Sequence, residues 1–451
     1  MQPTPPAAPD ETEVPDVPFR TALRTWARVG LLSFGGPAGQ IAVMHRILVE
    51  EKRWIGEAHF LHALNYCMLL PGPEAQQLAT YIGWLMHRVR GGLVAGLLFI
   101  LPGIVSILAL SILYASYRDA TLVSALFFGL KPAVIAVVVE AVVRIGRRAL
   151  ANRARVWIAA AAFAGIFFLH LPYPLILVGA GVAGYVGGRV RPDLFAPAAA
   201  PAGHAARPAR RTSWRATVRV VAVCAVLWWA PVAALALWAA PGSVFVAEGL
   251  FFGHAAAVTF GGAYAVLAYV AQQAVETYGW LAPGEMLDGL GMAESTPGPL
   301  IMVLQFVGFM GAYRNPGGLP PLAAGVLGSL LTTWVTFAPS FLFIFAGAPY
   351  IERLRGHRGL GSTLSGITAA VVGVVLNLAV WFAVHVLFAR VGQARLGPVR
   401  VPAPEWASLD PASLVIAIAA AIAIFRYKLG MIPTLAGAAA VGIVYRLVIG
   451  G

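Results

Sequence analysis

Long runs of apolar residues without a charged side chain dominate the pattern of this chain. Four of them extend over Gly91–Tyr117, Val156–Gly188, Val220–Ala247 and Gly359–Ala389. Each run exceeds the ~20 residues that an α-helix needs to cross a bilayer, and the ~10-residue alternation of a membrane barrel is not seen. The pattern predicts an all-α polytopic membrane protein with about 10–13 membrane segments, some of them short.

Proline shapes the longest of these runs. Pro172-Tyr173-Pro174 divides the stretch from Val156 to Gly188, because proline removes a helix donor and clashes with the preceding turn. We therefore expect a helical hairpin there. Composition agrees with a membrane protein, since only 11% of the residues are charged, against about 25% in soluble domains.

Charge sets the expected domain boundaries. Residues 1–18 are acidic and rich in proline, which predicts a disordered cytoplasmic tail without a signal peptide. Residues 191–213, rich in Ala, Pro and Arg, predict a cytoplasmic linker between a half at 19–190 and a half at 214–451.

The net charge of +13 arises largely from arginines at the ends of apolar runs, so we interpret it as anchoring at a cytoplasmic membrane rather than nucleic-acid binding. One such cluster is Arg144, Arg147, Arg148, Arg153 and Arg155.

An internal repeat relates the two halves. A shift of 226 positions brings Phe34-Gly35-Gly36 onto Phe260-Gly261-Gly262 and Pro71-Gly72-Pro73 onto Pro297-Gly298-Pro299. The first copy is surrounded by arginines and the second by carboxylates, so the positive-inside rule predicts opposite orientations in the membrane. Arg390, Arg395 and Arg400 oppose this topology, because they would lie outside. An inverted repeat with broken or re-entrant helices is typical of transporters.

The repeated glycine and proline motifs predict interrupted helices. Non-helical backbone is tolerated at membrane depth only where it is buried in protein or lines a wet cavity. Pro297 and Pro299 suit the first turn of a helix whose free amides Ser295 or Thr296 could cap, and such an N-terminus attracts anions. Kinks or tight helix packing are the alternative explanation of the motifs.

Polar residues near the motifs extend the candidate site. Gln77 and Gln305 lie in apolar surroundings, and Glu74 and Glu294 flank the two Pro-Gly-Pro motifs. A carboxylate beside an anion would carry a proton, orient an arginine or lie at the rim of the cavity. Lys131 either binds a doubly negative ligand or reaches the interface or a carboxylate such as Glu140. We expect no metal or cofactor, because Cys67 and Cys224 are far apart in the sequence and no nucleotide-binding motif is present.

The motif stretches also resemble a known family. "FGGPAGQIAVM", "LLPGPEAQQLATYIGWLMHRVRGGLVAGLLFILPG", "TFGGAYAVLAYVAQQAVETYGWL" and "DGLGMAESTPGPLIMVLQFVGFMGAY" are similar to the long-chain proteins of the chromate ion transporter family. The resemblance implies export of chromate across the cytoplasmic or inner membrane, with sulfate as a related or competing anion. It carries the family's motif positions over to Phe34, Gly35, Gly36, Pro37, Pro71, Gly72, Pro73, Phe260, Gly261, Gly262, Pro297, Gly298 and Pro299. The second half has Ala263 where the first has Pro37, so the halves need not bind equally.

Three functions remain open from the residues alone. The first is a secondary transporter whose broken helices hold the anion between the repeats. The second is an anion channel with passive flux, and the third is an intramembrane enzyme acting on a lipid phosphate, for which His59 and His62 would be metal candidates. The expected partners are chromate, sulfate and the bilayer; a homodimer is left open.

Overall fold

The computed structural model describes residues 17–117, 120–195, 213–239, 242–260, 262–350, 358–397 and 399–448. Within these ranges nearly all regular structure is helical, and the strands β1 (Val391–Leu396) and β2 (Val399–Pro404) pair as one antiparallel hairpin. Among the described helices, seven are long and apolar enough to cross a membrane and three more are shorter but apolar. The predicted all-α polytopic class is confirmed. Residues 1–16 of the expected tail and 196–212 of the expected linker lie outside the described residues.

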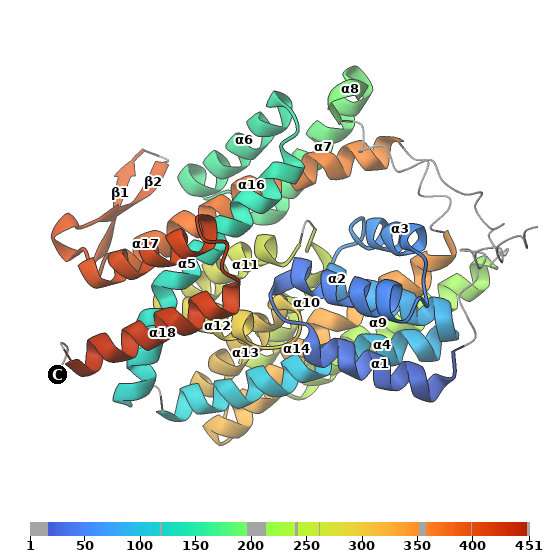
Figure 1. Ribbon diagram of the computed structural model, residues 1–451, viewed down its shortest axis with the longest axis horizontal. Coiled ribbons are helices and arrows are strands. Elements are labelled where there is room, and N and C mark those ends of the chain that lie inside the picture. The colour runs from blue at the N-terminus through green and yellow to red at the C-terminus, as the bar shows by residue number, and fades with distance from the viewer. Residues whose placement is uncertain are drawn as a thin grey trace, which may run out of the picture.

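The N-terminal half begins with short elements and continues with long ones (Figure 1). Its elements are α1 (Phe19–Leu32), α2 (Gly36–His45), the π-helix η1 (Arg46–Glu51), α3 (Glu57–Cys67), α4 (Glu74–Tyr117), α5 (Thr121–Ala149), α6 (Arg153–Leu169), α7 (Tyr173–Val190) and the single turn α8 (Pro192–Phe195). Pro172 precedes α7, and the Asn152 side chain caps α6 by accepting a hydrogen bond from the Arg155 amide. The hairpin predicted over 156–188 is therefore present as α6 and α7.

The C-terminal half, expected over 214–451, begins with α9 (Trp214–Trp238). Its further elements are α10 (Val244–Ala257), α11 (Ala263–Gln272), the π-helix η2 (Gln273–Thr277), α12 (Pro283–Ser295), η3 (Leu300–Met302), α13 (Val303–Arg314), α14 (Pro321–Gly347), η4 (Ala348–Tyr350), α16 (Arg358–Leu387), β1, β2, η5 (Trp406–Ser408), α17 (Pro411–Phe425) and α18 (Met431–Val448). The apolar run over Val220–Ala247 is not one helix, because α9 ends at Trp238 and α10 starts at Val244.

The order of elements in the first half returns in the second. In each half a 14-residue helix precedes Phe-Gly-Gly, and then come a shorter helix ending in a π-helix, another short helix, Pro-Gly-Pro and a short helix followed by a long one. Hydrogen bonds repeat as well: the Lys52 amide donates to Ile47 O and the Tyr278 amide to Gln273 O, both at 2.9 Å and 226 positions apart. This order is what the predicted duplication requires, and the opposite orientation of the halves stays a prediction.

Helix α4 contains a sharp bend that divides it into two helices. His87 and Arg88 leave the helical region, Arg88 with φ 53°. The two parts fold back on each other, since Gly83 packs on Gly91 and Gly96 on Thr80. Small residues allow such close approach. The part after the bend corresponds to the span predicted over Gly91–Tyr117, and α13 with α14 forms the equivalent pair.

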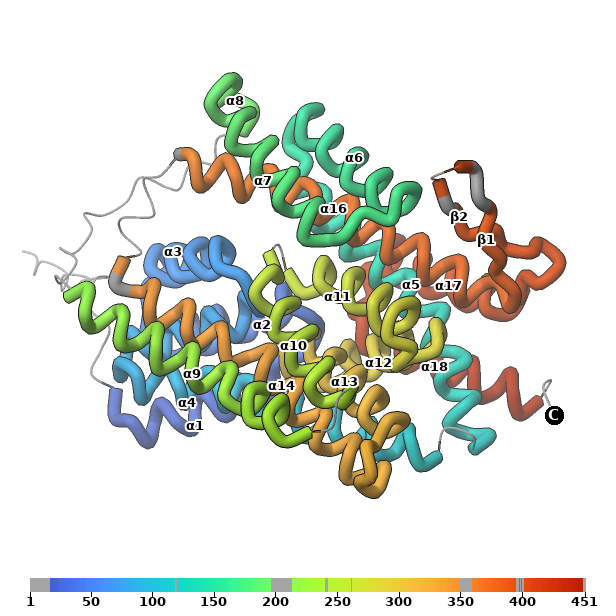
Figure 2. Tube along the Cα trace, turned by 180° about the vertical axis from the view of Figure 1, so that it is seen from behind, coloured from blue at the N-terminus to red at the C-terminus, as the bar shows by residue number. Residues whose placement is uncertain are grey.

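The helices form two groups that lie side by side (Figures 1 and 2). The first group contains α1, α4, α9, α10, α13 and α14, and the second contains the last three helices of each half, α5–α7 and α16–α18. In the second group the halves exchange partners, because α5 packs on α17 and α18 while α16 packs on α6 and α7. Gly129 of α5 meets Gly442 of α18, and Gly366 of α16 meets Gly184 of α7. This exchange ties the two halves into one unit.

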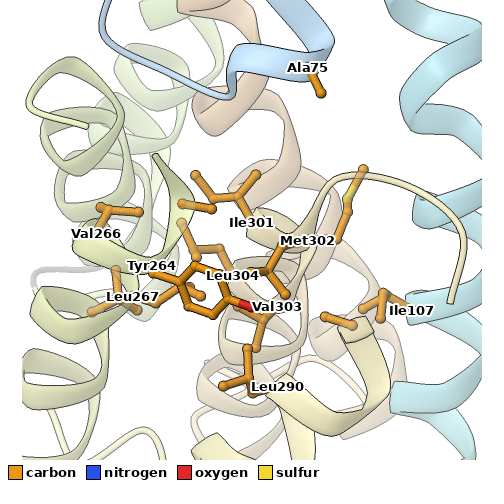
Figure 3. Packing of buried hydrophobic residues seen from close by; sticks show 14 of the residues in the cluster. Ala75, Ile107, Tyr264, Val266, Leu267, Leu290, Ile301, Met302, Val303 and Leu304 are labelled. Atoms are coloured by element: carbon orange, nitrogen blue, oxygen red, sulfur yellow. The ribbon is translucent and has the colours of Figure 1, made fainter. Parts of the chain in front are cut away.

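The core between these groups is built from the short elements beside the motifs. Figure 3 shows Tyr264 of α11 among Leu290, Val303 and Leu304, all of them buried. Because these residues flank the second Phe-Gly-Gly and Pro-Gly-Pro motifs, the breaks are held in a packed protein environment. Such burial is the condition under which irregular backbone is tolerated in a membrane.

Candidate functional site

The four backbone breaks are joined across the halves by a reciprocal pair of hydrogen bonds. The Gly72 amide donates to Thr259 O and the Gly298 amide donates to Ser33 O, both at 2.8 Å. The shift of 226 that relates Gly72 to Gly298 also relates Ser33 to Thr259. Each Pro-Gly-Pro motif is therefore fastened to the chain just before the other half's Phe-Gly-Gly motif. The breaks are a shared structure rather than separate helix kinks.

The two central glycines adopt backbone angles that other residues avoid. Gly72 has φ 124° and Gly298 has φ 108°, a region that residues with a Cβ rarely occupy. Proline has no N–H group, so the glycine amide is the single N–H of each tripeptide and it is already bonded within the protein. The Pro-Gly-Pro motifs thus position the following helices, and the free amides there are those of the first helical turn.

Ser295 and Thr296 do not cap the helix that follows Pro297. Ser295 Oγ and Thr296 Oγ1 both donate backwards to Met292 O, at 3.1 and 2.9 Å, so the predicted capping role is wrong. A hydroxyl that bonds to the preceding turn is a common alternative to capping. These two residues therefore close α12, and Pro299 stands at the start of η3.

The first Phe-Gly-Gly break opens into space. Gly35 and Gly36 have φ 82° and 69°, and a Cβ at either residue would meet no heavy atom within 4 Å. Pro37 lies in the first turn of α2, and Phe34 is half-buried. In the second copy Phe260 is half-buried and Gly262 has φ 96°, while Gly261 lies outside the described residues.

A basic cavity of about 720 Å³ reaches the first break. We call it the basic pocket; its charged lining consists of Glu140, Arg144, Arg147, Arg148 and Lys428, and Gly35 lies at its wall. Four cations against one carboxylate make the pocket attractive to an anion. From the sequence we interpreted the three arginines as anchors at the membrane surface, and no motif indicated that Lys428 lies in a binding site. The pocket forms because α5 of the first half packs on α17 and α18 of the second.

The two candidate carboxylates lie near the second break and interact with these arginines. Glu74 Oε1 is 3.6 Å from the place where a Cβ on Gly262 would stand. Glu294 is buried and accepts a hydrogen bond from Tyr264 Oη at 2.5 Å. Arg148 interacts electrostatically with Glu74, and Arg144 with Glu294. The hydrogen-bond partner of Glu294 is Tyr264 and the ion-pair partner of Arg144 is Glu140, so the role of the two candidate carboxylates stays a prediction.

Lys131 is paired with a different carboxylate from the one named in the sequence. Its Nζ lies 3.2 Å from Asp288 Oδ2 of α12, and Tyr114 donates to the same oxygen at 2.8 Å. Glu140 instead pairs with Arg144 at 3.3 Å. Lys131 thus neutralises a buried carboxylate, and its role as an anion ligand stays a prediction.

Gln77 and Gln305 support the backbone with their amide groups. Gln77 Nε2 donates to Pro71 O at 2.7 Å, and Gln305 Nε2 donates to Ile104 O at 3.0 Å. The Oε1 atom of each side chain is buried and has no hydrogen-bond partner among the described residues. Gln77 thereby holds the first Pro-Gly-Pro loop against the helix that follows it.

Comparison with known proteins identifies the family. A sequence model described as "Chromate transporter" matches residues 20–185 and 246–443, one stretch in each half. The chain belongs to the chromate transporter family. The family resemblance seen in the motif stretches is therefore confirmed, and the family is one of transporters and not of enzymes.

Two relatives of this chromate transporter family member match along most of its length, and a shorter one matches along about a third. The "Chromate transport protein" of Pseudomonas aeruginosa is 32% identical over 378 residues, 81% of each chain. That of Cupriavidus metallidurans is 27% identical over 80% of this chain and 82% of its own. The "Uncharacterized transporter YwrB" of Bacillus subtilis is 26% identical over 154 residues, 34% of this chain and 77% of its own. No solved structure matches the chain.

Proposed function

We propose that the protein is a secondary transporter that exports chromate from the cytoplasm across the inner membrane, with sulfate as a related and competing anion. The observation that carries this proposal is the basic pocket, which brings four cations to the Gly35 break. Relatives named for chromate transport support chromate as the substrate. The proposal places the N-terminus and the central linker in the cytoplasm, because arginines are concentrated around the first Phe-Gly-Gly motif and in the linker.

The anion would bind between Arg144, Arg148 and the start of α2. Arginine offers paired donors to an oxyanion, and a helix N-terminus adds free amides and about half a positive charge. Gly35 and Gly36 leave room beside that N-terminus. The sequence predicted both the Phe-Gly-Gly and the Pro-Gly-Pro motifs as anion sites, and this proposal keeps the Phe-Gly-Gly break and adds the arginines of α5.

Movement of the two helix groups would carry the anion across. The basic pocket is lined by Gly35 and by residues of α5, of α17, of the loop after α17 and of the start of α18. If the halves are inverted, as their charges predict, rocking of the second group around the fixed breaks would close this pocket and open an equivalent one on the opposite face. The same residues would then serve both conformations.

The test is radiolabelled chromate flux in proteoliposomes under an imposed potential and, separately, an imposed pH gradient. We expect gradient-dependent flux that falls with added sulfate. Arg148→Gln and Arg144→Gln should each weaken chromate binding about 10- to 100-fold, because a hydrogen bond to a charged group contributes about 1.5–3 kcal/mol. Arg153→Gln removes an exposed arginine that does not line the pocket and should leave binding unchanged.

Three results would contradict parts of this proposal. Chromate flux that follows the potential with no coupled ion would favour a channel. Binding that is unchanged in both arginine variants would remove the basic pocket from the pathway. Absence of chromate flux under every gradient would reject chromate as the substrate.

A further inference from the structure

A second cavity lies under the β1–β2 hairpin. It measures about 100 Å³ and lies between the C-terminal part of α16, the end of α6 and α11, with residues from both strands forming part of its wall. We call it the hairpin pocket. Figure 1 shows β1 and β2 beside α6, α16 and α17, at the edge of the molecule. Gln272, Asn377 and Gln393 are among its polar lining residues.

The hairpin pocket occupies the repeat-equivalent position of the basic pocket. A shift of 237 positions carries Gly129, Ala133 and Val137 of α5 onto identical residues of α16. The same shift carries the lining residues Glu140, Arg144 and Arg148 onto Asn377, Trp381 and His385, which line the hairpin pocket.

The other wall of the two pockets is equivalent as well. A shift of 258 positions carries Ile166, Phe167 and His170 of the hairpin pocket onto Ile424, Phe425 and Lys428 of the basic pocket. Six lining positions of the two cavities are therefore equivalent in the repeat. Each pocket is lined by both halves: α5 and the end of α17 line the basic pocket, and α16 and the end of α6 line the hairpin pocket.

The main structural difference between the two pockets is the β1–β2 hairpin, an added segment in the second half. In the first half α5 is joined to α6 by residues 150–152, whereas in the second half α16 is joined to α17 by residues 388–410. The two shifts, 237 and 258, differ by 21 positions, and the hairpin occupies this extra length. Gly392, Gln393, Val401 and Pro402 of the added segment line the smaller cavity. No such segment follows α5.

The charge of the two pockets differs at the equivalent positions. Arg144 and Arg148 are replaced by Trp381 and His385, and Lys428 is replaced by His170. The hairpin pocket also contains Glu276, which accepts a hydrogen bond from Gln272 at 3.4 Å. Amides and imidazoles can donate to an oxyanion but attract it far less than a cluster of permanent cations. The hairpin pocket therefore suits release of an anion rather than its capture.

We propose that the hairpin pocket is the second mouth of the anion pathway, on the membrane face opposite the basic pocket, and that the β1–β2 hairpin is its lid. The basic pocket, about 720 Å³, and the hairpin pocket, about 100 Å³, then represent the open and the narrowed side of a single conformation. An ion pair between Arg390 Nε and Glu405 Oε2, 3.1 Å apart, closes the base of the hairpin. The proposal rests on the proposed function, because it assigns a second opening to the same pathway.

Thiol labelling at two equivalent positions tests the lid. In a protein with Cys67→Ala and Cys224→Ser, Glu140→Cys and Asn377→Cys place one thiol in each pocket at the same repeat position. The probe is 2-sulfonatoethyl methanethiosulfonate, an anion that does not cross membranes. We expect Glu140→Cys to react from the cytoplasmic face and Asn377→Cys to react slowly, from the opposite face. Replacement of residues 391–404 by Gly-Ser-Gly-Ser should raise the rate at position 377 at least tenfold and leave position 140 unchanged.

Reaction of both thiols from one face would overturn the proposal, as would a rate at position 377 that does not respond to loss of the hairpin. If the shortened protein fails to fold, Gln272→Cys with Gln393→Cys provides a second test, since both residues line the hairpin pocket. Oxidation should link them and abolish chromate flux, and dithiothreitol should restore it. Full flux in the cross-linked protein would overturn the lid.

The two proposals can fail separately. A wild-type protein that carries no chromate, yet shows the expected labelling at positions 140 and 377, would reject chromate as the substrate and keep the two-mouthed pathway. Normal chromate flux with labelling that contradicts the lid would reject only the inference about the hairpin.

Discussion

The two halves of this protein share a backbone arrangement but differ in the side chains that it presents. Gly72 and Gly298 make the same hydrogen bond to the opposite half, at the same 2.8 Å. At the equivalent positions of the two pockets, however, Arg148 stands opposite His385 and Arg144 opposite Trp381. The two halves thus share the backbone frame, while the positive charge is concentrated in one pocket.

This difference has a physical explanation. The hydrogen bonds between the breaks satisfy backbone groups that would otherwise be unpaired at membrane depth, where each unpaired group costs several kcal/mol. Loss of either bond would therefore destabilise the fold. The charged side chains of the pockets are not needed for these backbone bonds. Because one pocket would capture the anion and the other release it, equal affinity in both would hold the anion at the second site.

The largest effect is expected from breaking the shared frame on the side where the neighbouring atoms are backbone. A Cβ on Gly298 would lie 2.9 Å from Cα of Gly103, whereas on Gly72 it would lie 2.7 Å from Gln77 Nε2 and 2.9 Å from Ser340 Oγ, both of them side-chain atoms. Both substitutions force an unfavourable φ, which costs about 1–3 kcal/mol, but side chains can move and backbone cannot. We expect Gly298→Leu to abolish chromate flux in inserted protein, Gly298→Ala to lower flux about 100-fold, and Gly72→Ala to lower it less.

Flux in proteoliposomes and thermal unfolding in detergent measure this difference. Gly437→Ala is the matched control, because a Cβ there meets no atom within 4 Å, and it should change neither quantity. Equal loss at Gly72 and Gly298 would show that the backbone angle alone decides the effect. Wild-type flux in Gly298→Leu would exclude the break from the pathway.

A smaller effect should follow from making the two pockets alike. Trp381→Arg together with His385→Arg gives the hairpin pocket two cations at the positions of Arg144 and Arg148. We expect about tenfold tighter chromate binding and a turnover that falls by a similar factor, because the anion would leave the second pocket more slowly. Equilibrium binding and flux at saturating chromate separate the two quantities. Tighter binding with unchanged turnover would show that release from this pocket does not limit transport.

The sequence predicted the fold class and the breaks better than the residues around them. Apolar runs and proline positions were sufficient for α6, α7 and α16, and the shift of 226 related all four breaks before any contact was known. The hydroxyls of Ser295 and Thr296 were placed on the wrong helix, because a capping residue and one that bonds to the preceding turn have the same local sequence. Arg144 and Arg148 were interpreted as anchors, since arginines at the end of an apolar run do not reveal that α17 and α18 enclose them. The shift of 226 that aligns the motifs does not align Arg144 and Arg148 with Trp381 and His385. These residues align only at a shift of 237.

The smallest effect concerns a contact that only one half possesses. Gln40 Nε2 donates to Gly298 O at 2.5 Å, and the shift of 226 places Val266 at the equivalent position, where no such bond is possible. Gln40→Met should lower the free energy of unfolding by about 1 kcal/mol, the usual contribution of one hydrogen bond. The loss stays small because Gln40 Oε1 is buried without a partner among the described residues, and the substitution removes that unfavourable group as well. Denaturant unfolding measures this loss, and a loss of several kcal/mol in Gln40→Met would mean that the first half holds the Gly298 loop far more firmly than the reciprocal backbone bonds do.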